Sequence, residues 1–185
     1  MTIDLFKHYR GYIKGAGYKE HLRVIEKIHP YHHLINKRII EESKEFFFTK
    51  DSYNADGGIS NVRALQCRDI NSPSLSLIRD WILTFVDESK HGFPMFIPDQ
   101  WLAIYGKGDY TVDHLHLPAT YSFVYFVQSP KGSSPLVFTT SRKKIKAEDG
   151  KVVIFPSILR HHVPKNKCDD RIVFAGNIFV KYNDV

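Results

Sequence analysis

The sequence predicts an α+β protein whose C-terminal half is a β-sandwich or jelly roll. Apolar residues recur at helical spacing in the first half of the chain, whereas short β-rich runs separated by turn formers fill the second half. Because the helices need a sheet against which to bury their apolar faces, we expect a single domain over residues 1–185. Residues 1–92 would supply helices and the first strands, and residues 93–185 the β-rich core.

The composition is that of a folded protein of one domain. Of the 185 residues, 43% are hydrophobic and 14% aromatic, which is enough for a substantial core. No stretch approaches the roughly 18 consecutive apolar residues of a membrane span, and the N-terminus lacks a secretory signal. We therefore expect a soluble, cytoplasmic protein without a membrane partner. Cys67 and Cys168 form no C-x-x-C pair, so both are interpreted as free thiols.

The chain is basic, with a formal net charge of +6 that is concentrated in one cluster: Arg142, Lys143, Lys144 and Lys146. Such a cluster could attract an anionic partner. However, neither zinc-finger spacing nor the aromatic strand of an RNA-recognition motif accompanies it. We interpret the cluster as a solvated loop or turn, and we expect no nucleic-acid partner.

The first half of the chain begins with an ambiguous segment and a predicted helix. Residues 22–28 fit either a short strand or a helical turn, and Pro30 ends the segment because it disfavours helix at the residue before it. Residues 31–47 have an amphipathic helical pattern, whose apolar positions are Leu34, Ile35, Ile39 and Ile40. Residues 51–58 are predicted to be a loop.

A strand and a second helix follow. Residues 62–67 alternate between apolar and polar side chains, which favours a strand. The helix begins at Asn71-Ser72-Pro73, because a polar cap followed by proline at the first helical position costs no backbone hydrogen bond. It would end near residues 90–92, and its buried positions would be Leu75, Ile78, Ile82 and Val86.

The second half of the chain is predicted to be strands. The β-rich runs are residues 101–105, 121–127, 136–139, 151–155 and 171–180. Turn formers separate them at residues 106–109, 130–134 and 149–150. Strands at such regular spacing after a helical region are typical of a sandwich or a jelly roll.

Two histidines follow the first of these turns, in the segment Asp113-His114-Leu115-His116. In an extended chain, residues two apart point to the same side, so His114 and His116 can converge on one metal ion. This spacing also fits two ordinary imidazoles on a polar strand face. The pattern alone permits a metal site without requiring one.

A second histidine pair and an arginine complete the set of candidates. His161 and His162 follow directly after a predicted buried strand. A metal site at the mouth of a barrel needs a third ligand at such a strand end. Only one of the two histidines would point inward. Arg171 opens the last strand. Beside a metal pocket, a buried arginine needs an anion, and its guanidinium matches a carboxylate. Alternatively, Arg171 is a surface residue paired with Asp169 or Asp170.

Taken together, these residues resemble the 2-oxoglutarate and iron(II)-dependent oxygenases, in particular a small subgroup of prolyl-hydroxylase-like proteins often encoded by phages and bacteria. The similar stretches occur in the family's order over roughly the C-terminal half. They are Trp101 to Tyr110 leading to His114-x-His116-Leu-Pro118, then Ser122-Phe-Val-Tyr-Phe126, Phe155-Pro-Ser-Ile-Leu-Arg-His161 and Arg171-Ile-Val-Phe-Ala-Gly-Asn177.

The resemblance implies a double-stranded β-helix, or jelly roll, with the N-terminal helices packed outside it as a buttress. It selects His161 as the third ligand of an iron(II) ion, beside His114 and His116. Family members generally have Asp or Glu where this chain has His116. Asp113 is the obvious substitute. Because neighbours on a strand face opposite ways, Asp113 should point away from the other ligands. We therefore keep it either as an alternative ligand or as a residue that supports the ligands from outside.

The resemblance also implies that Arg171 binds the distal carboxylate of 2-oxoglutarate. Relatives often have a tyrosine at the position of Phe126, whose hydroxyl helps to hold that carboxylate. Arg171 would therefore need another helper in this chain. The candidates for this cosubstrate-binding role are Tyr105, Tyr125 and Asn177.

The implied activity is that of a dioxygenase that uses iron(II), 2-oxoglutarate and O₂ and releases succinate and CO₂. We expect it to hydroxylate a protein or peptide side chain, with proline favoured, in the host cytoplasm if a phage encodes it. One alternative is a cupin-like three-histidine dioxygenase or isomerase without 2-oxoglutarate, which would not need Arg171. Another is a non-catalytic jelly-roll module, such as a structural component of a virus particle, which would take up no iron.

Overall fold

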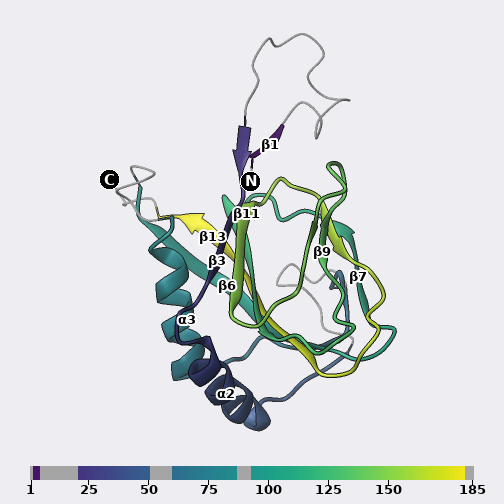
Figure 1. Cartoon of the computed structure of the whole chain (residues 1–185). Coiled ribbons are helices and arrows are strands. Elements are labelled where there is room, and N and C mark those ends of the chain that lie inside the picture. Colours follow the sequence, from purple (N-terminus) through teal and green to yellow (C-terminus); the bar gives the residue numbers. More distant parts are fainter. Residues whose placement is uncertain (1, 5–20, 51–59, 87–92, 182–185) are drawn as a thin grey trace.

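The structure is a computed structural model that describes residues 2–4, 21–50, 60–86 and 93–181. Two antiparallel sheets face each other, and two helices lie outside one of them (Figure 1). The six-stranded sheet has the order β3-β11-β8-β13-β6-β5, and the five-stranded sheet has the order β10-β9-β12-β7-β4. This arrangement confirms the jelly roll with buttressing helices that was predicted from the sequence.

The strands of the six-stranded sheet come from both halves of the chain. They are β3 (Ile25–Ile28), β5 (Leu65–Cys67), β6 (Met95–Tyr105), β8 (Tyr121–Gln128), β11 (Lys151–Pro156) and β13 (Arg171–Val180). The ambiguous residues 22–28 are therefore extended, with β3 at the edge of the sheet beside β11. A separate two-stranded sheet pairs β1 (Thr2–Asp4) with β2 (His21–Arg23).

The five-stranded sheet is shorter and carries the histidines. Its strands are β4 (Val62–Arg63), β7 (Tyr110–His114), β9 (Leu136–Phe138), β10 (Lys144–Ile145) and β12 (His161–Val163). The predicted strand at residues 62–67 is split at Ala64, because β4 pairs with β7 whereas β5 pairs with β6 of the other sheet. The basic cluster lies at β10 and the adjoining turn, with exposed side chains.

The two helices are shorter than the sequence pattern predicts. Helix α2 (His32–Glu42) continues as one 3-10 turn at Ser43–Glu45, and helix α3 (Pro73–Leu83) ends well before residues 90–92. Residues 90–92 and the predicted loop at 51–58 lie outside the described residues. The predicted start of α3 is confirmed. The Ser72 hydroxyl accepts a hydrogen bond from the Leu75 amide, and Pro73 occupies the first turn.

Alternation along the strands divides the apolar residues between two clusters. One cluster fills the space between the sheets and includes Phe126, Phe138 and Phe155. The other lies between the six-stranded sheet and the helices and includes Ile39 and Ile78. Because successive strand residues face opposite sides, the same strand contributes to both clusters. The interior between the two sheets is where the candidate site lies.

Candidate active site

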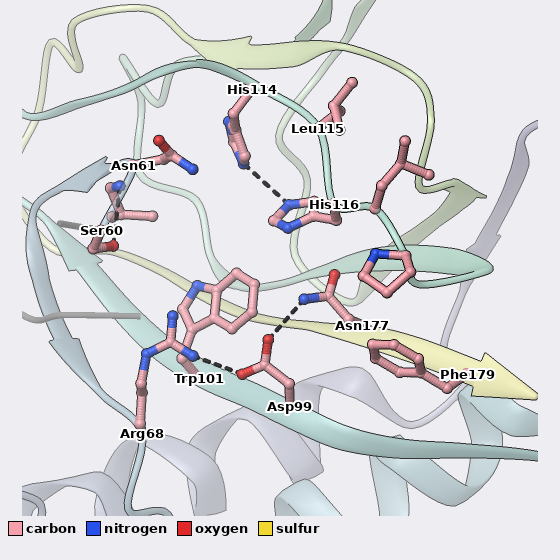
Figure 2. A pocket seen from close by; sticks show the side chains of 13 residues that line it. Ser60, Asn61, Arg68, Asp99, Trp101, His114, Leu115, His116, Asn177 and Phe179 are labelled. Atoms are coloured by element: carbon pink, nitrogen blue, oxygen red, sulfur yellow. Dashed lines mark hydrogen bonds and ion pairs between the residues drawn. The ribbon is translucent and has the colours of Figure 1, made fainter. Parts of the chain in front are cut away.

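Three imidazoles meet at the open end of the space between the sheets. His114 ends β7 and His161 begins β12, and the two are direct partners across the antiparallel pair. His116 lies two residues further along the chain. Its Nε2 atom is 3.0 Å from Nε2 of His114, and Figure 2 shows the two rings directed toward each other. Within the described residues, one potential ligand atom from each histidine lies within 4.8 Å of the others, close enough to hold one metal ion.

Backbone carbonyls orient two of these rings. Nδ1 of His114 donates a hydrogen bond to the Val112 carbonyl at 2.8 Å, and Nδ1 of His161 donates to the Leu159 carbonyl at 2.8 Å. A neutral imidazole whose Nδ1 carries the proton presents its Nε2 lone pair to the other side. The fold thus prepares both rings as Nε2 ligands before any ion binds.

Burial keeps all three imidazoles neutral. It lowers the pKa of His116 to about 3, and the charges of His114 and Arg68 act in the same direction. It also lowers the pKa of His114, and it lowers that of fully buried His161 well below its ordinary value, with the neighbouring imidazoles adding to the effect. Neutral imidazoles have free lone pairs, so the arrangement favours binding of a divalent cation over binding of protons.

Deeper in the same interior cavity lies Arg171, at the start of β13. Its side chain is 1% exposed, and its guanidinium carbon lies 4.4 Å from the centre of the Tyr105 ring and 5.6 Å from that of Phe126. The cavity is lined by Arg171 together with all three histidines. Arg171 is therefore an interior residue rather than a surface partner of Asp169 or Asp170.

The buried guanidinium is only partly satisfied. Among the residues that the structure describes, neither Nε nor Nη1 of Arg171 has a hydrogen-bond acceptor. A buried cation without compensation is strongly unfavourable, so its environment calls for an anion in the cavity. A ligand with a carboxylate at Arg171 and metal-binding oxygens at the histidines would satisfy both ends of this cavity.

Of the helpers proposed for Arg171, Tyr105 lies closest to this arrangement. Its hydroxyl is buried in the cavity and lies 2.7 Å from the Thr111 hydroxyl. Thr111 was not predicted from the sequence, because an isolated threonine in a strand has no distinguishing pattern. In a regular strand, Thr111 would face the side opposite to His114, because the two residues are three positions apart. It faces the same side because the pairing of β7 with β12 shifts register between them.

The suggestion that Tyr125 helps to hold the cosubstrate needs correction. Tyr125 belongs to the cluster beneath the helices, and its hydroxyl donates a hydrogen bond to Oδ1 of Asn36 on α2. The neighbouring Phe126 faces the interior between the sheets. Because adjacent strand residues point to opposite faces, Tyr125 is directed away from Arg171.

Asp113 also lies away from the proposed ligand atoms, so the structure does not support it as an alternative ligand. Its carboxylate pairs with Nε of Arg160 at 2.8 Å and accepts a hydrogen bond from the Thr139 hydroxyl. The Thr139 hydroxyl also contacts Nδ1 of His162. Asp113 and His162 thus share the outer face of the five-stranded sheet, whereas His114 and His161 face inward.

Asn177 lies in a wider pocket that opens beside His114 and His116. Its amide donates to Asp99 at 2.7 Å (Figure 2). Its carbonyl accepts from the Ser122 hydroxyl, so both ends of the side chain are occupied. Asp99 also forms a 2.6 Å ion pair with Arg68. Sequence reasoning missed Arg68 and Asp99, because the two residues are 31 positions apart and only the pairing of β5 with β6 brings their strands together.

The wall of this pocket combines charged and apolar groups. The Arg68 guanidinium lies 4.9 Å from the centre of the Trp101 ring, which is an arrangement that favours cation–π attraction. The Trp101 ring centre is 5.9 Å from that of His116. Much of the remaining lining is apolar: Val62, Leu115, Leu117, Pro118 and Phe179. The pocket gives a molecule from solvent direct access to the histidine cluster.

Comparison with known proteins shows which family the chain is similar to. Residues 99–177 match the family model described as "Putative 2OG-Fe(II) oxygenase", and this segment contains the three histidines and Arg171. No curated protein matches the chain by sequence.

Solved structures of such enzymes share the fold at low sequence identity. The viral collagen prolyl hydroxylase of Paramecium Bursaria Chlorella virus-1, solved with 2-oxoglutarate, is 15% identical with a TM-score of 0.66, over 84% of this chain and 94% of the other. A Trichoplax adhaerens prolyl hydroxylase, solved with a hypoxia inducible factor peptide fragment, is 12% identical with a TM-score of 0.63, over 84% of this chain and 82% of the other. The α-ketoglutarate-dependent epimerase SnoN from nogalamycin biosynthesis is 9% identical with a TM-score of 0.67, over 84% and 76%.

The resemblance inferred from the sequence is therefore confirmed. Residues 99–177 match the model of the 2-oxoglutarate and iron(II)-dependent oxygenases, and the fold is shared with prolyl hydroxylases. Iron(II) and 2-oxoglutarate are the cofactors of this family, and its enzymes are oxidoreductases. None of the helices that the structure describes is long and apolar enough to cross a membrane.

Proposed function

We propose that the protein is an iron(II)- and 2-oxoglutarate-dependent dioxygenase that hydroxylates a side chain of a protein or peptide, with proline as the first candidate. The observation that carries this proposal is the shared cavity, with three neutral imidazoles at one end and, at the other, a buried guanidinium with two nitrogens that have no acceptor among the described residues. A cupin-like enzyme that uses no 2-oxoglutarate would have no use for such a cation. A non-catalytic module would need neither end of the cavity.

In this proposal, His114, His116 and His161 are the iron ligands. Two nitrogen ligands about 2.1 Å from one ion and at right angles lie about 3.0 Å apart, which agrees with the 3.0 Å between the Nε2 atoms of His114 and His116. Three imidazoles on one side leave the opposite coordination positions open for cosubstrate and O₂. Because His116 replaces the usual carboxylate, the ligand set is uncharged and the metal site is more positive than in most relatives.

The cosubstrate would span the cavity, with its distal carboxylate at Arg171 and Tyr105 nearby. Asn177 is assigned to the substrate pocket instead, since its amide is bound to Asp99 and Ser122. When bound, iron(II) and 2-oxoglutarate supply the oxidising chemistry, in which O₂ converts 2-oxoglutarate to succinate and CO₂ and the substrate gains one oxygen atom. The residues of this chain orient the ligands, hold the carboxylate and exclude water from the apolar interior.

The substrate would enter through the wider pocket beside His116. Its apolar rim and its Arg68–Asp99 pair suit a segment of peptide that combines an apolar ring with backbone hydrogen-bonding groups. The Trichoplax adhaerens prolyl hydroxylase in complex with a peptide fragment supports this substrate class by analogy of fold. SnoN shows that the same fold also serves an epimerase, so the reaction outcome must be measured.

The test combines metal uptake with product analysis. Purified protein with iron(II), 2-oxoglutarate and proline-containing peptides should form succinate and add one oxygen atom to a peptide, as measured by mass spectrometry. His161→Ala should abolish metal binding and succinate formation, whereas His162→Ala, the neighbouring residue that faces outward, should leave both nearly unchanged. Metal uptake without 2-oxoglutarate turnover would favour the cupin-like alternative. Failure to take up iron(II) would favour the non-catalytic module.

A further inference from the structure

The basic cluster is an exposed surface at one edge of the five-stranded sheet. Arg142 and Lys143 lie in the turn after β9, Lys144 lies in β10, and Lys146 follows directly after it. All four residues are exposed, whereas Ile145 between them is buried in the core. Because the side chains alternate in this extended segment, Lys144 and Lys146 point to the same outer side.

Strand pairing places this surface close to the metal ligands. His161 on β12 pairs with Phe138 on β9, and the Phe138 amide donates a hydrogen bond to the Lys143 carbonyl at 2.9 Å. Adjacent strands lie about 4.8 Å apart, so the backbone of Lys143 is about 10 Å from that of His161. The Thr139 amide, where the turn begins, donates to the carbonyl of Arg160, the residue before His161. The basic cluster therefore begins at the rim of the open end and continues along the edge of the sheet.

Most of the positive charge in the cluster is not neutralised by ion pairs. Lys143 lies 3.7 Å from Glu26 on β3. Among the residues that the structure describes, no carboxylate lies within ion-pair distance of Arg142, Lys144 or Lys146. Lysines on an edge strand can serve only to prevent association between sheet edges, and β10 is such a strand. That role does not account for Arg142 and Lys143, which lie in the turn outside the strand.

The spacing of these cations fits an acidic polypeptide better than a nucleic acid. Lys144 and Lys146 are about 6.6 Å apart along an extended chain, which is also the spacing of alternate acidic side chains on an extended peptide. Duplex DNA instead carries one negative charge per about 1.7 Å. The carboxylates of Glu26 and Glu148 border the cluster and would repel such a continuous charge. A peptide can place a few carboxylates opposite the cations and avoid these two.

We propose that the basic cluster binds an acidic segment of the polypeptide substrate and thereby delivers the residue to be oxidised to the pocket beside His116. This inference rests on the proposed function and adds a recognition surface outside the pocket. From the histidines to Lys146 the path over the rim is roughly 15–25 Å, or about five to eight residues of extended chain. Substrates should therefore carry acidic residues at that separation from the target residue. A segment bound at the cluster raises the effective concentration of the target at the pocket.

The first test measures binding to the surface alone. The probe is a fluorescein-labelled peptide of about eight residues that alternates glutamate with serine, and fluorescence anisotropy follows its binding. The triple variant Arg142→Gln, Lys144→Gln, Lys146→Gln should bind the probe about 3- to 100-fold more weakly, as expected for the loss of three exposed ion pairs. Added salt should weaken binding to the wild type because exposed charges are screened.

A matched variant separates the cluster from the overall positive charge of the chain. Lys37→Gln, Lys107→Gln, Lys165→Gln removes the same number of exposed charges outside the cluster and should bind the probe like the wild type. Equal losses in the two triple variants would overturn the proposal, because binding would then follow net charge alone. A short DNA duplex that displaces the probe at lower concentrations than unlabelled peptide would also overturn it, in favour of a nucleic-acid surface.

The second test connects the surface to the metal without turnover. Manganese-loaded protein is mixed with two peptides that carry proline before or after a run of glutamates, at about five to eight residues. In at least one peptide, paramagnetic manganese should broaden the NMR signals of proline with the wild type and much less with the triple variant at Arg142, Lys144 and Lys146.

The two proposals fail in different ways. If the protein binds manganese and both peptides but the proline signals stay sharp, delivery to the site is overturned while the proposed function stands. If the protein binds no manganese, the proposed function fails, and the anisotropy measurement still decides whether the cluster binds an acidic chain.

Discussion

At the scale of single residues, Arg171 shows how a binding site can cost stability. A charge that is buried without partners is unfavourable in the free protein, and apolar residues of similar size often replace buried charges without loss. Arg171 is 1% exposed and has two nitrogens without partners among the described residues. A purely structural role would not account for such a residue, whereas an anionic ligand would.

Replacement of Arg171 is therefore expected to separate stability from binding. In the absence of ligands, Arg171→Met should leave the free energy of unfolding unchanged or raise it by about 1–4 kcal/mol. Addition of 2-oxoglutarate should raise the melting temperature of the manganese-loaded wild type, because a ligand that binds the folded state stabilises it, but not that of the variant. Thermal unfolding with and without 2-oxoglutarate measures both effects. A variant strongly destabilised in the absence of ligand would contradict this account.

At the scale of elements, contacts on the outer face join the two strands that carry the histidines. Asp113 precedes His114, and Arg160 precedes His161, so the Asp113–Arg160 ion pair joins β7 to the start of β12 directly behind the site. The Thr139 amide donates to the Arg160 carbonyl at 2.9 Å. Exposed ion pairs contribute little to stability. This pair can instead hold the two imidazoles in register.

Loss of this ion pair should affect metal binding more than folding. Asp113→Asn is expected to weaken manganese binding by up to about 10-fold, at the lower limit for residues that orient ligands, and to change the free energy of unfolding by less than about 1 kcal/mol. The control is Asp80→Asn, which removes an exposed ion pair with Arg79 on α3 and should leave metal affinity unchanged. Identical metal titrations for wild type and Asp113→Asn would disprove the orienting role.

The close packing of β6 and β8 against β13 depends on one glycine, Gly176. A Cβ atom at Gly176 would lie 2.7 Å from the Asp99 carbonyl oxygen and 2.8 Å from the Phe123 ring. Gly176→Ala should therefore destabilise the protein by about 1–3 kcal/mol, as overpacking does. Chemical denaturation measures the loss. At Gly106 a Cβ would meet only side-chain atoms, Asp169 Oδ1 at 3.3 Å and Asp109 Oδ2 at 3.5 Å, so Gly106→Ala should change stability by less than about 0.5 kcal/mol. Equal effects at the two glycines would argue against this explanation.

At the scale of the whole molecule, the helices support the sheet opposite the site. The Tyr125 hydroxyl donates to Asn36 Oδ1 at 2.6 Å, and the Asn36 amide donates to the Val127 carbonyl at 2.7 Å. These buried hydrogen bonds attach α2 to β8. The aromatic ring of Trp81 on α3 packs edge-on near Tyr125, so both helices meet this strand. The helix layer thus holds β8 from behind without reaching the ligands.

Tyr125→Phe should consequently reduce stability and leave binding intact. The loss of its hydroxyl strands the Asn36 acceptor in a buried position, which should lower the free energy of unfolding by about 1–3 kcal/mol. The manganese and 2-oxoglutarate affinities of the folded variant should equal those of the wild type. Denaturant unfolding and calorimetric titration measure the two quantities. Weaker 2-oxoglutarate binding with unchanged stability would instead assign Tyr125 to the cosubstrate.

Much of this fold was predictable from local sequence patterns. Pro73 after Ser72 marks the start of α3, and the β-rich runs of the second half overlap β6, β8, β9, β11 and β13, although β6 begins earlier than predicted, at Met95. The ends of the helices and the break at Ala64 were not predictable. The periodicity of side chains continues across such points, whereas pairing with one sheet or the other decides where the chain turns.

The sequence by itself determined the candidate ligands and the family resemblance, because H-x-H spacing in an extended segment brings two imidazoles to one side and the remaining motifs follow in the order of the family. The residue pattern left His161 and His162 open, the resemblance favoured His161, and the structure places His161 opposite His114. Only the tertiary structure decided that Tyr105 rather than Tyr125 lies beside Arg171, and that Thr111 joins them. Strand periodicity tells which residues share a face. Which face becomes the interior depends on the opposing sheet and on the helices, and these are distant in the sequence.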